Sequence, residues 1–156
     1  MQKITPFLWF DNQAEDAANF YCALFPNSKI NRATRYLADM PQPEGSVMTV
    51  EFTLDGQEFV ALNGGKIFEF TPAISFSVPC QTQAEVDHFW DALSDGGVIM
   101  PCGWVTDKFG VTWQIVPEVL LEMLRDPDIA KAKEVTQAMM QMEKLDIAEL
   151  KAAYAR

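Results

Sequence analysis

Two short stretches decide the fold because they repeat one another: NFYCAL at residues 19–24 and HFWDAL at residues 88–93. Each has two consecutive aromatic residues, one variable position and Ala-Leu, and the two stretches are 69 positions apart. The same offset aligns Phe7 with Phe76 and Trp9 with Val78. A second match, GQEFVA at 56–61 with GVTWQI at 110–115, has an offset of 54. The 15-residue difference falls where the first half carries the loop ADMPQPEG at 38–45. A duplicated module explains both matches.

Hydrophobic spacing and turn residues predict the same order of elements in both halves. In the first half we expect a strand at 3–10, a helix at 14–25 that starts after Asp11-Asn12, and strands at 29–36, 46–54 and 58–62, the last two joined by the hairpin turn Asp55-Gly56. In the second half we expect a strand at 73–79, a helix from Thr82 to about 94, and strands at 98–100, 103–106 and 111–116. Thr82 and Glu85 form a capping-box pattern. The prediction is two βαβββ modules, residues 1–66 and 70–117, within a domain of residues 1–117.

Alternation along the strands predicts one face under the helices and one open face. The helix face is expected to hold the bulky residues Phe7, Trp9, Phe59, Ala61, Ile74, Phe76, Trp113 and Ile115. The open face is expected to hold Leu8, Val60, Ser75, Ser77, Thr112 and Gln114, which we predict to be a ligand pocket of hydroxyls, one amide and apolar walls. The alternative is that these polar side chains satisfy one another or a few waters.

Composition limits the classes of partner. The chain has 156 residues, 49% of them hydrophobic, and a net charge of −10, which disfavours nucleic acid and anionic membranes as partners. No apolar run is long enough to span a membrane and no signal peptide is evident, so we expect a cytoplasmic protein. Three cysteines without a C-x-x-C pair fit reduced thiols.

Residues 118–156 are predicted to be a helical extension. Apolar residues recur at helical spacing, and Asp126-Pro127-Asp128 interrupts them. Asp146 and Glu149 form a capping-box pattern before a last short helix. We expect the methionine-rich stripe to pack on the second module or on a partner chain.

The sequence resembles the PhnB-like branch of the vicinal oxygen chelate superfamily, the glyoxalase and bleomycin-resistance fold, whose members often carry the label 3-demethylubiquinone-9 3-methyltransferase. The residues that carry the likeness are ITPFLWF at 4–10, NFY at 19–21, ALNGG at 61–65, ISF at 74–76 and, above all, CGWV at 102–105, DKFG at 107–110 and WQIVP at 113–117. The resemblance implies an α+β fold in which two sheets curl into a cup that binds a small molecule, and it implies a homodimer.

Enzymes of this superfamily hold a divalent metal with His, Gln or Glu side chains on the first and last strand of each module. Those positions correspond here to Ile4, Val60, Ala73 and Gln114. Only Gln114 can bind a metal, and the single histidine, His88, lies on the second predicted helix beside Phe89. We therefore predict no metal site built by the protein. The methyltransferase label implies S-adenosylmethionine, but no G-x-G-x-x-G turn is present and we expect no cofactor.

Candidate catalytic residues are few. Gln114 is one, and the Cys102 thiol is another if Lys108 lowers its pKa. We favour a module that binds a small molecule in a metal-free cup. The alternatives are a metal-independent enzyme that uses Gln114 or the loop from Cys102 to Lys108, and a structural homodimer whose cup is vestigial.

Overall fold

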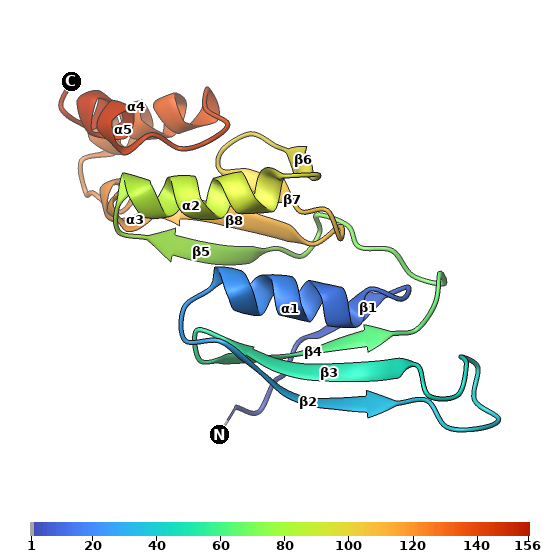
Figure 1. Cartoon of the computed structure of the whole chain (residues 1–156). Helices are drawn as coiled ribbons and strands as arrows, with labels where there is room; N and C mark the ends of the chain where they lie inside the picture. The colour runs from blue at the N-terminus through green and yellow to red at the C-terminus, as the bar shows by residue number, and fades with distance from the viewer. Residues whose placement is uncertain (1) are drawn as a thin grey trace. The chain divides into compact units, whose positions relative to one another are not determined.

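The computed structural model describes residues 2–156 and divides the chain into two compact units, of which the first ends at Phe70 and the second spans Thr71–Arg156. Each unit contains a four-stranded mixed sheet with a helix on one face (Figure 1). The fold is α+β, and each unit has the βαβββ order predicted from the repeat. None of the helices in the described part of the chain is long and apolar enough to cross a membrane.

The first unit consists of β1 (Phe7–Phe10), α1 (Ala14–Leu24), β2 (Lys29–Arg35), β3 (Val47–Leu54) and β4 (Gln57–Asn63). The strand order is β1-β4-β3-β2, with β1 parallel to β4 and the other pairs antiparallel. The hairpin between β3 and β4 turns at Asp55 and Gly56, both at positive φ, as the sequence predicts. Tyr21 of α1 is fully buried and stacks on Phe52 of β3, which fixes the sheet face that α1 covers.

The second unit repeats this arrangement with β5 (Phe76–Cys80), α2 (Gln83–Ser94), β6 (Val98–Ile99), β7 (Trp104–Thr106) and β8 (Thr112–Pro117). The order β5-β8-β7-β6 corresponds strand for strand to the first sheet, and β5 is parallel to β8. Thr82 caps α2 as predicted, because its hydroxyl accepts the Glu85 N–H at 3.1 Å. In a capping box the Glu85 carboxylate would accept the N–H of the N-cap residue Thr82. Here it accepts the N–H of Gln81, one residue earlier in the chain.

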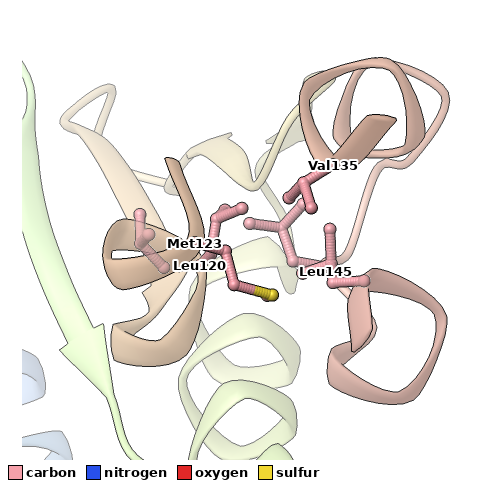
Figure 2. Close-up of a cluster of buried hydrophobic side chains, with 6 residues drawn as sticks. Leu120, Met123, Val135 and Leu145 are labelled. Atoms are coloured by element: carbon pink, nitrogen blue, oxygen red, sulfur yellow. The ribbon is translucent and has the colours of Figure 1, made fainter. Parts of the chain in front are cut away.

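The C-terminal extension forms α3 (Glu118–Leu124), α4 (Ile129–Met140) and α5 (Ile147–Tyr154), which pack within the second unit. Its apolar residues meet the end of β8 in one buried cluster: Val116, Leu120, Met123, Val135, Leu145 and Leu150. Figure 2 shows Leu120, Met123, Val135 and Leu145 pointing toward one another. Asp128 and Asp146 cap α4 and α5, the latter as predicted.

The extension also binds the second module through polar contacts. The carbonyls of Met142 and Glu143 accept the N–H groups of Cys102 and Gly103 at 2.9 and 2.8 Å. The Gln83 side chain on α2 donates to the carbonyl of Leu145 at 3.1 Å and accepts the N–H of Ile147 at 2.8 Å. The segment before α5 is therefore held on two sides, by the β6–β7 connection and by α2.

Candidate functional site

The open face of the first sheet, opposite α1, is the candidate site. Strand register places its side chains in three rows across the sheet. The row nearest the β3–β4 hairpin is Lys29, Thr53 and Glu58; the middle row is Arg32, Glu51, Val60 and Phe7; the third row is Thr34, Thr49, Leu62 and Trp9. Charged and hydroxyl groups therefore occupy the β2 side of this face, and apolar groups occupy the β1 side.

A hollow of about 820 Å³ lies over the first two rows. The hollow is lined by all seven residues of the row nearest the hairpin and the middle row. Asn31 and the N-terminal segment around Thr5 also line it. The hollow is within the size range of small-molecule sites, which is about 300–1,000 Å³. Every lining residue belongs to the first unit.

A β-bulge in β2 shapes the polar wall of this hollow. Ile30 pairs with Phe52 and Arg32 pairs with the preceding residue Glu51, so Asn31 has no partner in the ladder. An extra residue of this kind turns neighbouring side chains toward one face, and both Asn31 and Arg32 line the hollow. The Asn31 amide donates to the Thr53 hydroxyl at 2.9 Å.

One ion pair lies in the middle of the hollow. Arg32 Nε is 2.9 Å from the Glu51 carboxylate, and the two side chains are 71% and 43% exposed. A pair this exposed contributes about 0–1 kcal/mol to stability, so its main effect is to orient the guanidinium. The opposite wall consists of Val60, which is buried, and Phe7, which is 62% exposed.

The N-terminal segment closes one end of the hollow. The Gln2 amide donates to the backbone carbonyl of Glu58 at 3.1 Å and accepts the N–H of Glu58 at 3.1 Å. These two bonds extend the edge of β4 and hold residues 2–6 beside the hollow. Val60 N–H also donates to the carbonyl of Pro6 at 3.0 Å.

The predicted faces are correct for β4, β8 and the observed β5 and wrong for β1, and Ile74, predicted on the helix face, precedes β5 and is 74% exposed. Leu8 pairs with Ala61, is buried and lies on the helix face, whereas Phe7 and Trp9 lie on the open face. The cause is one extra residue in the turn between the first strand and the helix. This turn spans residues 11–13 in the first unit and residues 81–82 in the second. The helices α1 and α2 align at an offset of 69 residues. The strands β1 and β5 align at an offset of 70 residues, so Phe7 occupies the position in the first sheet that Ser77 occupies in the second.

The other predicted pocket residues lie where the alternation places them. Val60 lies on the open face of the first sheet, and Ser77, Thr112 and Gln114 lie on the open face of the second. The Gln114 amide donates to Ser75 at 2.8 Å. Thr112, which is 1% exposed, bonds to Thr106 at 2.9 Å. In the second unit, therefore, Gln114 and Thr112 each have a side-chain partner. A pocket shared by Val60 and the second-unit residues stays a prediction.

The Cys102 and Lys108 candidates have separate structural roles. Cys102 has a positive φ of 64° in the turn before β7, and its N–H is bonded to the extension. The Lys108 ammonium lies 5.5 Å from the centre of the Phe109 ring. Burial raises the pKa of another thiol, that of Cys80, to about 12, with smaller contributions from Glu85 and Glu118, so this group is not a nucleophile at neutral pH.

The carboxylate between them, Asp107, has a structural function. Asp107 is 3% exposed and accepts from the N–H groups of Phe109 and Val111 and, at 2.8 Å, from the Trp113 indole. Buried carboxylates with this many donors stabilise turns. The motif DKFG at 107–110 followed by Trp113 is therefore a folding motif of the second unit.

The residues present do not fit a protein-built metal site. Of the predicted ligand positions on β4 and β8, Val60 has no donor atom and the Gln114 amide is bonded to Ser75. Within residues 2–156, no three His, Cys, Asp or Glu side chains are grouped so as to hold an ion. His88 lies edge-on to the Phe89 ring beside it on α2, at 5.1 Å between centroids. The predicted absence of a metal stays a prediction, which elemental analysis of the purified protein tests.

The turns between strand and helix do not fit a nucleotide-type cofactor. Residues 11–13 precede α1 and residues 81–82 precede α2, and none of them is glycine. A glycine-rich turn at this position is what lets a helix N-terminus approach a cofactor phosphate or sugar closely in dinucleotide-binding folds. No step through S-adenosylmethionine follows from these residues.

Sequence reasoning missed most of the hollow. Of the lining residues it proposed only Val60, and it did not propose Gln2, Thr5, Phe7, Lys29, Asn31, Arg32, Glu51, Phe52, Thr53, Gly56, Glu58 and Phe59. The signal that could have found part of this set is the alternation of Thr49, Glu51 and Thr53 with buried apolar residues in β3. The bulge at Asn31 leaves no comparable signal.

Comparison with known proteins identifies the family. A family model described as 3-demethylubiquinone-9 3-methyltransferase matches residues 2–116. A solved Bacillus cereus protein described as a putative 3-demethylubiquinone-9 3-methyltransferase, PhnB protein, is 41% identical, with a TM-score of 0.69 over 74% of this chain and 99% of its own. No curated protein matches the chain.

More distant structures share only the fold. A Pseudomonas aeruginosa protein is 21% identical, with a TM-score of 0.63 over 76% of this chain and 98% of its own. The fosfomycin resistance protein FosX of Mesorhizobium loti is 13% identical, with a TM-score of 0.54 over 81% of this chain and all of its own. The chain belongs to the 3-demethylubiquinone-9 3-methyltransferase family, the PhnB-like branch of the vicinal oxygen chelate superfamily.

Proposed function

We propose that this protein binds a small organic molecule on the open face of the first sheet, without a metal ion held by the protein. The observation that carries the proposal is the hollow of about 820 Å³ between an apolar wall at Phe7 and Val60 and a polar wall at Arg32 and Glu51. An apolar surface with a few polar groups on one side is typical of a site that buries a small amphipathic ligand.

Phe7 supports the proposal because its exposure has no structural benefit. It is 62% exposed on the open face, where its ring contributes little to the core that forms under α1. An aromatic ring at the side of a hollow offers a flat surface on which another ring can stack. Phe68 is an exposed aromatic residue of the same unit that is also 62% exposed but does not line the hollow, and it packs edge-on to Trp9.

The test is a titration of protein that has been treated with a chelator and freed of metal. Benzyl alcohol, benzoate and benzylamine are added separately while amide chemical shifts are followed by NMR. We expect at least one probe to shift amides of Arg32, Glu51 and Val60, and we expect Phe7→Ser to weaken that binding by about threefold or more. Phe68→Ser is the matched control and should leave the affinity unchanged.

Three results would contradict the proposal. In the first, no probe shifts the amides of the hollow although the protein is folded. In the second, binding appears only after a divalent ion is added back. Equal loss of affinity in Phe7→Ser and Phe68→Ser would also count against it, because it would indicate a general effect on the unit.

A further inference from the structure

We propose that the hollow of the first unit selects a small, singly charged organic anion with a flat apolar part, its anionic group bound by Arg32 and Lys29. This inference rests on the proposed function and adds the class of ligand. It follows from a count of the hydrogen-bonding groups in the hollow that are already used and of those that remain.

The acceptors on the central strand are already engaged. The Glu51 carboxylate holds Arg32 Nε at 2.9 Å, and the Thr53 hydroxyl oxygen accepts from Asn31 at 2.9 Å. The ion pair offsets the negative charge of Glu51 in the middle row. With this charge offset, Glu51 attracts a cationic ligand less strongly than an unpaired carboxylate would.

The donors on β2 are only partly used. The ion pair with Glu51 is formed through Nε of Arg32, and the guanidinium carries further N–H donors on its Nη atoms. Within residues 2–156, the Lys29 ammonium has neither an ion pair nor a hydrogen bond, and it lines the same hollow. A guanidinium fixed on one edge by a carboxylate presents its other edge in a preorganised orientation, which suits a carboxylate or phosphonate group.

The remaining charge limits the size and charge of the anion. The Glu58 carboxylate lines the hollow on the same row as Lys29, and the whole chain carries a net charge of −10. A polyanion would be repelled by the Glu58 carboxylate and by the net negative charge of the chain. A ligand with a single anionic group can reach the donors of β2 while its apolar part lies against Phe7 and Val60. The two walls therefore fit a small aromatic or alicyclic monoanion.

The experiment compares benzoate with benzyl alcohol and benzylamine, which have the same ring and differ in the charge of the substituent. Dissociation constants come from amide titrations at low and high salt. We expect benzoate to bind at least about fivefold more tightly than benzyl alcohol, and benzylamine to bind most weakly. Phenylphosphonate, which carries a second negative charge above neutral pH, tests the limit on charge, and at alkaline pH we expect it to bind more weakly than benzoate.

Arg32→Gln is expected to remove the advantage of benzoate and leave the affinity for benzyl alcohol within about twofold. Arg35→Gln is the matched control: it is on the same strand, changes the charge equally and lies outside the hollow, where Arg35 donates to the carbonyl of Gly45 at 2.9 Å. A loss caused by overall charge would be equal in both variants.

The outcomes separate the two proposals. If the three probes bind in the hollow with equal affinity, or if Arg35→Gln acts like Arg32→Gln, the preference for an anion is wrong and the binding function stands. If no probe shifts the amides of the hollow, the proposed function itself fails. Preferential binding of benzoate that Arg32→Gln abolishes and Arg35→Gln does not would support both.

Discussion

The two units share one βαβββ plan but use their open faces differently. In the first sheet, Arg32 and Lys29 keep donors that face a hollow, and Phe7 exposes its ring. In the second sheet, Gln114 is bonded to Ser75 and Thr112 is bonded to Thr106. After a duplication, the open face can therefore hold groups exposed to a ligand in one copy and groups bonded within the unit in the other.

The units also differ in how each helix begins. The α1 N-cap, Gln13, makes no side-chain bond, and the Ala14 N–H instead donates to Asn63 Oδ1 at 2.8 Å from the end of β4. The α2 helix is capped locally by Thr82. Pro117 occupies the position equivalent to Asn63 and leads directly into α3. The first unit thus caps its helix with a residue distant in the sequence. In the second unit the equivalent position, Pro117, instead begins the C-terminal extension.

The largest effect that we expect concerns the extension, which only the second unit has. Leu145 is fully buried in the cluster with Leu120 and Val135, so Leu145→Ala should lower the free energy of unfolding by about 2–5 kcal/mol. Leu37→Ala makes the same change at a residue of the first unit that is 65% exposed, and it should cost less than about 0.5 kcal/mol. Urea denaturation measures both. Similar values for the two variants would mean that the extension is not part of the second core.

The next effect compares the two helix caps. Asn63→Ala leaves the buried N–H of Ala14 and the carbonyl of Val47 without their side-chain partner, and it should cost about 2–3 kcal/mol. Thr82→Ala removes an exposed cap and should cost about 1 kcal/mol. Denaturation of both variants under one condition tests the order. A larger loss for Thr82→Ala would contradict the tertiary cap.

The smallest effect is a dependence on acid pH that belongs to the second unit. A hydrogen bond from the Tyr154 hydroxyl, followed by one from the Asp128 N–H, lowers the pKa of Asp126 below its usual 3.8. A lowered pKa in the folded state stabilises the protein above the usual pKa, and this contribution is lost as pH falls through the lower folded value. Stability should therefore decline below about pH 4, less steeply in Asp126→Asn. Unfolding midpoints between pH 5 and pH 2.5 measure the slopes, and identical slopes would show that the bond contributes nothing.

The same sign applies to Asp87, at the contact of the extension with α2. Hydrogen bonds from Gln83 and Lys144 lower the pKa of Asp87, and Lys144 Nζ is 3.2 Å from Asp87 and 3.3 Å from Asp91. Burial alone would lower the pKa of Lys144, but its bonds to the two aspartates raise it. These groups are exposed to solvent, so Asp87→Asn should have only a small effect on the acid slope, and added salt should reduce that effect.

Most of the fold could be predicted from the sequence because its signals are local. The aromatic-aromatic-x-Ala-Leu repeat identified both helices, Asp55-Gly56 identified the hairpin, and the capping residues Thr82 and Asp146 identified two helix starts. The predicted start of α1 after Asp11-Asn12 is correct, but the donor at Ala14 is satisfied by Asn63, a residue 49 positions away, and not by a local cap. Local patterns carry no information about a cap of this kind.

The candidate site was predicted less well, for two physical reasons. A one-residue difference in the turns before the helices shifts the register of β1, which placed Leu8 on the open face in error and hid Phe7. The bulge at Asn31 then brings Arg32 onto the open face opposite Glu51, and neither charge is unusual in the sequence. The homodimer, the cytoplasmic location, the absence of nucleic-acid partners and the catalytic candidates Gln114, Cys102 and Lys108 stay predictions.

The central claim is that the first sheet, and not a metal centre, holds the ligand. The most direct measurement is a crystal structure of chelator-treated protein soaked with benzoate, with elemental analysis of the same preparation. We expect density for the ring beside Phe7 and Val60, with its carboxylate at Arg32, and no stoichiometric divalent ion. A divalent ion held by side chains of the protein with the carboxylate bound to it, or density only on the second sheet, would contradict the account.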